Sequence, residues 1–80
     1  METTIRLNTF SDIQTDKICY WYEKDRWWIY LPKCGCGDLS NHTVIENWNN
    51  TITVTPSILV KAHDNKQRHG YLEGGIWREV

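Results

Sequence analysis

The chain contains no long run of apolar residues. None of its hydrophobic stretches approaches the roughly 18–20 residues that a membrane-spanning helix needs, so we expect no membrane anchor. The segment Met1–Thr4 has neither the basic region nor the apolar core of a secretory signal. These two absences predict a protein without an export leader that resides in the cytoplasm.

An excess of charge of either sign is also missing. Nine Lys and Arg residues stand against ten Asp and Glu residues, which gives a formal net charge of −1. Proteins that capture nucleic acid through the phosphate backbone usually carry a strong positive charge. Nucleic acid is therefore possible as a ligand only through local features such as stacked Trp and Tyr rings, and it is not the favoured partner.

Familiar catalytic motifs are absent from the sequence. There is no His-Glu-x-x-His zinc-hydrolase motif, no Gly-x-Ser-x-Gly nucleophile turn and no phosphate-binding Gly-Lys-Ser/Thr loop. Ser57 follows Pro56 at an expected break in a strand, where a serine usually satisfies the backbone. We therefore expect a protein that is not an enzyme.

The aromatic residues are mostly of two kinds. Five Trp and four Tyr occur beside one Phe and one Met. Trp and Tyr join a large apolar ring to a polar group, so they serve either the core of a small domain or a binding surface. If part of them is exposed, the candidate contacts for a partner are Trp28, Trp48, Tyr71 and Trp77.

The pattern of residues is typical of β-strands throughout. Residues 18–22 and 27–31 are almost all strand formers, and the charged residues around Asp25 predict a hairpin between them. In the second strand both alternating faces are apolar, which predicts a central strand or one whose outer face is covered. A second hairpin is expected at residues 71–77 around Gly74 and Gly75.

We therefore predict one all-β, mainly antiparallel domain over residues 1–80, built from two hairpins and a loop rich in Cys and Gly. Residues 1–16 are expected to form an edge strand or a short helical turn. Residues 51–55 alternate in polarity and predict a further strand, which Pro56 should interrupt.

The most informative motif is Cys34-Gly35-Cys36-Gly37, which lies in a segment (33–41) that predicts a loop. The glycines permit a tight turn, so two thiolates can reach one cation. Zinc suits a mixed shell of sulfur and imidazole, although one residue between the cysteines is fewer than usual. A structural zinc ion would also help so small a domain to hold its fold.

Two further ligands would complete a tetrahedral shell. His69 stands at the beginning of a predicted strand, and His42 follows Cys36 closely enough to close the loop on the same ion. Cys19 and His63 are further possibilities. Cys19 is also explained as a small buried hydrophobic residue, and His63 as a solvated loop residue.

Several short motifs occur in an order that resembles an uncharacterised family of small phage and prophage proteins. Their residues are Cys34–Gly37, Trp48, Thr55–Val60, Arg68–Leu72 and Gly75, and they span about residues 28 to 78. The resemblance implies a metal-binding protein of a phage, present in the bacterial host cell, with no assigned activity. Where many such sequences have a cysteine before the histidine, this chain has Arg68. If that cysteine is a ligand, either His42, Cys19 or water replaces it here, or this chain has lost the metal.

From this resemblance and the aromatic content we expect a small binding protein that acts through contact with another protein. The expected partner belongs to the host or to its defence system, and one hypothesis is the inhibition of a CRISPR nuclease. The alternative is a module that binds single-stranded nucleic acid on stacked Trp and Tyr rings. The sequence sets no oligomeric state.

Overall fold

The computed structural model describes residues 1–62 and 64–80, so the candidate ligand His63 lies outside the described residues. The described residues form eight strands and one short 3-10 helix, which confirms the prediction of an all-β, mainly antiparallel fold. The elements are β1 (Glu2–Arg6), η1 (Phe10–Asp12), β2 (Ile18–Glu23), β3 (Arg26–Leu31), β4 (Gly35–Asp38), β5 (Thr43–Glu46), β6 (Ile52–Lys61), β7 (Gln67–Glu73) and β8 (Ile76–Glu79).

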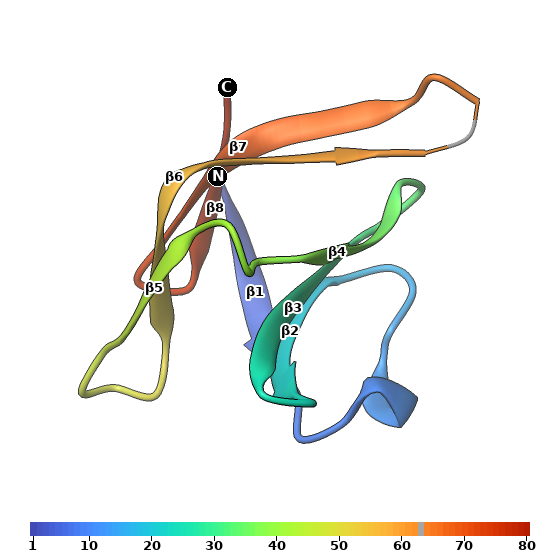
Figure 1. The fold of residues 1–80 in the computed structure, drawn as a ribbon. Coiled ribbons are helices and arrows are strands. Elements are labelled where there is room, and N and C mark those ends of the chain that lie inside the picture. Colours follow the sequence, from blue (N-terminus) through green and yellow to red (C-terminus); the bar gives the residue numbers. More distant parts are fainter. Residues whose placement is uncertain (63) are drawn as a thin grey trace.

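All eight strands belong to a single sheet in the order β4-β3-β2-β1-β8-β7-β6-β5. Among the described residues β1 and β2 form the one parallel pair, and the other neighbours are antiparallel. The two edge strands, β4 and β5, are consecutive in the chain. A short connection can join them because the sheet curls into a half-barrel (Figure 1). The short connection between them includes Leu39, which is buried in the core.

The main core lies on one face of the curled sheet. Its largest fully buried side chains include Trp77 from β8 and Tyr20 from β2. The alternating residues of β6 add Ile52 and Val54 to this core, as their pattern in the sequence predicts. Leu72 and Ile29 complete the contact between the two halves of the sheet.

A second, smaller cluster covers the opposite face of β2 and β3. It contains Leu7, Cys19 and Trp21, with Trp28 and Tyr30 packed against them. The segment between β1 and β2, which includes η1, lies over this side of the sheet (Figure 1). The prediction that the outer face of β3 is covered is therefore confirmed.

Three segments differ from the sequence-based expectation. Gly35–Asp38 was expected to be part of a loop but forms β4, because it completes a ladder with β3. β6 continues past Pro56, since a shift of register between Val54 and Ile58 accommodates the proline. β1 lies inside the sheet between β2 and β8 and is not an edge strand.

The hairpins also exceed the two that were expected. In the described chain five consecutive strand pairs are antiparallel neighbours, including β2–β3 and β7–β8 at the two predicted positions. The turn of β2–β3 uses Lys24 and Asp25 in the left-handed region, with φ of 56° and 62°. Among the described residues, no helix is long and apolar enough to cross a membrane.

Candidate binding site

Trp48 is the most exposed large hydrophobic residue of the described chain, with 97% of its surface accessible. It lies in the turn between β5 and β6, which we call the Trp48 turn (residues 47–50). The Asn47 side-chain amide donates to the hydroxyls of Thr51 and Thr53, both at 3.1 Å. The hydroxyl of Thr51 in turn donates to Asn49 Oδ1 at 2.6 Å. An exposed indole is thus held on a turn that its neighbours fix.

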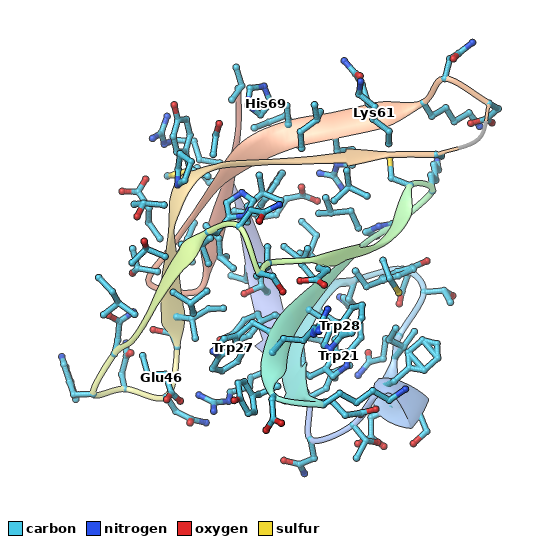
Figure 2. The ribbon with its side chains drawn as sticks, viewed as in Figure 1. Trp21, Trp27, Trp28, Glu46, Lys61 and His69 are labelled. Carbon is cyan, nitrogen blue, oxygen red and sulfur yellow. The ribbon has the colours of Figure 1, made fainter. Side chains whose placement is uncertain are left out.

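Arg6 in β1 connects this turn to the rest of the molecule. Its guanidinium forms an ion pair with Glu46 at 3.1 Å and a hydrogen bond to the carbonyl of Asn50 at 3.4 Å. The same guanidinium lies over the ring of Trp27, 5.0 Å from the centroid. Glu46 and Trp27 face each other across this region in Figure 2. The base of the Trp48 turn is therefore braced from the central strand of the sheet.

The other three candidate contacts are less accessible. Trp77 is 1% exposed and its indole N–H donates to Glu79 at 2.7 Å, so it is a core residue and offers no surface to a partner. Tyr71 is half-buried beneath the guanidinium of Arg78, 4.6 Å from its centroid. Together with Trp28 in β3, these residues lie on separate elements and form no single aromatic patch.

Trp28 belongs to a different feature, a concave site that we call the aromatic pocket. It has a volume of about 190 Å³ and is lined by Phe10, Trp21, Glu23, Lys24, Trp28 and Cys36. Figure 2 shows Trp21 and Trp28 side by side on β2 and β3, on the side nearer η1. The sequence did not indicate this pocket, because Phe10 reaches it only through the fold of the segment between β1 and β2.

Glu23 holds the wall of the aromatic pocket together. Its backbone carbonyl accepts the indole N–H of Trp28 at 3.0 Å, and its Oε1 accepts the backbone N–H of Phe10 at 3.1 Å. The rings of Phe10 and Trp21 are 5.8 Å apart between centroids. The pocket is thus an ordered aromatic site with a carboxylate in its wall.

The two cysteines of the predicted zinc motif lie at different sites. Cys34 is half-buried against the main core and lines a charged pocket that includes Lys33 and Arg68. Cys36 is exposed on β4 and lines the aromatic pocket. Partial desolvation of the thiol, and to a lesser degree the nearby Cys19, raises the pKa of Cys36. Cys36 is therefore mainly a neutral thiol at neutral pH.

The two histidines, by contrast, converge on Ser57. His42 Nε2 lies 3.0 Å from the backbone carbonyl of Ser57, and His69 Nε2 lies 2.8 Å from the Ser57 hydroxyl. His69 reaches this position because it pairs with Leu59 in the ladder between β6 and β7. Ser57 itself lies where the register shifts, so His42 satisfies a carbonyl in the irregular part of β6.

The described part of the chain contains no group of three or more His, Cys, Asp or Glu side chains placed to hold a metal ion. Cys34, Cys36, His42 and His69 therefore do not form one coordination shell as they are placed here. Cys19 is buried in the second, smaller cluster with Leu7 and Trp21, where it packs as a small hydrophobic residue. Zinc binding stays a prediction from the sequence.

The contact between Ser57 and His69 has the distance of a nucleophile and its base. A working pair also needs a group that orients the histidine and donors that stabilise an oxyanion. No carboxylate bonds to His69 in the described residues, and Ser57 lies within a strand. Ser57 instead connects the imidazoles of His42 and His69 where the register of β6 shifts. The spacing of these residues in the sequence does not reveal this contact.

Each of the four arginines pairs with a carboxylate. Arg6 pairs with Glu46, Arg26 with Asp38, Arg78 with Glu73, and Arg68 with both Glu2 and Glu79. All four guanidiniums also lie over aromatic rings. The four guanidinium groups that lie over aromatic rings are therefore already paired with carboxylates within the molecule.

The comparisons with known proteins give no relative. No protein-family model, no curated protein and no solved structure matches the chain. The similarity to a phage family thus stays a prediction from short motifs, and the function must be argued from the surface of the molecule.

Proposed function

We propose that this protein is a small binding protein without enzymatic activity, and that it acts by docking the Trp48 turn into the surface of a protein partner. The observation that carries the proposal is the 97% exposure of Trp48 on a turn fixed by its own hydrogen bonds. In line with the sequence resemblance, the proposed partner belongs to a bacterial host or to its defence system.

The energetics of interfaces support this role for Trp48. Trp is enriched among the few residues that carry most of the binding energy, because it buries a large area and has only two side-chain torsions to immobilise. The backbone of the turn is already ordered by Asn47, Asn49 and Arg6, so binding costs little further entropy. Ile45, which is 53% exposed on β5, adds apolar surface close to the turn in the chain.

The charge distribution favours a protein over single-stranded nucleic acid. Stacking proteins for nucleic acid combine exposed rings with free positive charges along the backbone track. Here the four arginines are engaged with carboxylates, and Glu46 precedes the exposed indole by two residues. Because Glu46 pairs with Arg6, no net positive charge from this pair lies beside the main aromatic contact to attract phosphate.

The test is affinity capture from a bacterial lysate with three forms of the protein: wild type, Trp48→Ala and Tyr22→Ala. Tyr22 is the matched control, because it is an aromatic residue that is 51% exposed and belongs to a different element, β2. We expect the same specific protein to be retained by wild type and Tyr22→Ala, and to be reduced at least tenfold by Trp48→Ala.

Two results would contradict this function. Equal retention of the captured protein by wild type and Trp48→Ala would show that the turn is not the contact. Binding to a single-stranded oligonucleotide that weakens steeply between 50 and 200 mM salt would favour the nucleic-acid alternative instead.

A further inference from the structure

The aromatic pocket and the Trp48 turn are complementary features of one chain. We propose that the indole of Trp48 from a second copy of the chain occupies the aromatic pocket, so that the protein associates with itself in a head-to-tail manner. This inference rests on the proposed function, because it uses the same turn as the contact and names a second copy as one partner.

The size of the pocket favours a single side chain as its occupant. Pockets for drug-sized ligands have volumes of roughly 300–1,000 Å³, whereas this one measures about 190 Å³. Its lining includes Phe10, Trp28 and the almost fully buried Trp21. Aromatic rings such as those of Phe10 and Trp28 prefer a further ring in an offset or edge-to-face arrangement. An aromatic side chain therefore matches both the volume and the walls of the pocket.

The polar groups of the pocket match an indole in particular. An indole N–H requires an acceptor when it is buried. Glu23 supplies one, because Phe10 engages its Oε1 and no side chain or backbone N–H of the described residues bonds to Oε2. Lys24 at the pocket pairs with no carboxylate of the described chain. Glu46 lies near Trp48 in the chain and pairs with Arg6 of its own copy, but its side chain is 62% exposed, so it can also approach Lys24 of the second copy.

Among the described residues Trp48 is the most exposed large hydrophobic side chain, so it has the most to gain from such a pocket. The turn and the pocket are different surfaces, so the contact is heterologous and one copy offers both a donor and an acceptor. A contact built around one indole is smaller than a standard interface. We expect a dissociation constant on the order of 0.1–1 mM.

The test is sedimentation equilibrium up to about 1 mM protein with variants that remove one side of the contact. Trp48→Ala removes the donor and keeps the pocket. Phe10→Ala removes a wall of the pocket and keeps the donor, and because Phe10 is 52% exposed the fold should survive. Cys36→Leu is a second pocket variant, which fills the space from the exposed strand β4. Tyr22→Ala is the control for loss of an exposed ring.

We expect the average mass of wild type and Tyr22→Ala to rise with concentration, while Trp48→Ala, Phe10→Ala and Cys36→Leu remain monomeric. An equimolar mixture of Trp48→Ala and Phe10→Ala should form a dimer and nothing larger, because one intact donor meets one intact pocket. A double variant with both substitutions should stay monomeric alone.

A wild type that remains monomeric at about 1 mM would overturn this inference. So would self-association that Trp48→Ala leaves unchanged, or a mixture of the two single variants that does not associate. None of these results affects the proposed function, which is judged separately by whether Trp48→Ala loses a captured protein. Conversely, failure of capture with successful self-association would leave the second copy as the partner of the turn.

Discussion

Gly70 shows how closely single residues are packed in this small core. A Cβ atom at this position would lie 2.6 Å from the Trp77 ring and 2.6 Å from the Arg78 carbonyl oxygen. Neither neighbour can move easily, because one is a buried ring and the other is backbone in the ladder between β7 and β8. The role of Gly70 is therefore to let Trp77 lie against the backbone of β7.

We predict that Gly70→Ala lowers the free energy of unfolding by about 3 kcal/mol, because the added methyl group overpacks the core. Gly74→Ala is the matched control. Its Cβ meets nothing within 4 Å, and only the positive φ of 57° is unfavourable, so it should cost about 1 kcal/mol. Urea denaturation of both variants measures the difference. Equal effects of the two substitutions would contradict the packing around Trp77.

Trp48 makes the opposite prediction about stability. Because its side chain is almost completely exposed, Trp48→Ala should change the free energy of unfolding by no more than about 0.5 kcal/mol. Thermal or urea unfolding of the variant tests this. A loss above about 1 kcal/mol would mean that the indole packs against the protein in solution and is not presented to a partner.

The contrast between Trp48 and Trp77 shows what the sequence can predict for single residues. Both were expected to be contacts, because residue type alone favours an interface for each. Two asparagines after Trp48 predict a turn, and a turn is exposed. Trp77 lies near the end of the chain, and its burial follows only from the pairing of β8 with both β1 and β7.

At the scale of elements, the Trp48 turn depends on Asn47. Its side-chain amide bonds to two threonines of the following strand, and its backbone N–H donates to the Thr51 carbonyl at 2.8 Å. Asn50 ends the turn with a positive φ of 67°, which Asn tolerates better than most residues. The conformation that presents Trp48 is therefore encoded by its neighbours.

We predict that Asn47→Ala weakens partner binding although it does not touch the indole. The loss of two side-chain hydrogen bonds should lower the free energy of unfolding by about 1–2 kcal/mol and loosen the turn. Amide hydrogen exchange at Asn50 and Thr51 should become faster, and capture of the partner should fall. Unchanged exchange at both amides would contradict the role of Asn47 in fixing the turn.

The strands divide into those that the sequence predicts and those that it does not. β2 and β3 are rich in strand formers with a clear alternation, so their hairpin is evident from residues 18–31. β4 consists of Gly-Cys-Gly-Asp, which has little strand preference of its own. It forms a strand because the edge of β3 supplies hydrogen-bonding partners, and this pairing cannot be predicted from local strand propensity.

At the scale of the whole molecule, the two ends of the chain are joined by a network of charges. Arg68 in β7 pairs with Glu2 in β1 and with Glu79 in β8, the latter at 2.8 Å. Partial burial alone would raise the pKa of Glu79, but hydrogen bonds from Arg68 and Trp77 outweigh it and hold the pKa below the ordinary value of 4.5. The ionised carboxylate is therefore favoured by the folded state.

This network predicts a loss of stability in acid. Since folding lowers the pKa of Glu79, its contribution is fully present above about pH 4.5 and is lost as the pH falls through the lower folded value. Asp38, whose pKa is lowered by Ser40 and then by Arg26, acts in the same direction. The melting temperature of wild type should fall below pH 4.5, and Glu79→Gln should reduce that fall.

A second variant for the acid prediction is Asp38→Asn. It removes the other carboxylate whose pKa is lowered and leaves the network at the chain ends intact. It should also reduce the fall, and the effects of the two substitutions should add because the sites share no partner. A Glu79→Gln profile parallel to that of wild type between pH 5 and pH 2.5 would contradict the contribution of this network.

The central claim about the whole molecule is that it binds through the Trp48 turn, and site-specific photo-crosslinking tests it most directly. A benzophenone-bearing amino acid replaces Trp48 in one form and the control residue Tyr22 in another, and each form is irradiated in bacterial cells. The account predicts a discrete crosslinked protein from position 48 and none from position 22. Crosslinks of equal strength from both positions, or none from position 48, would contradict it.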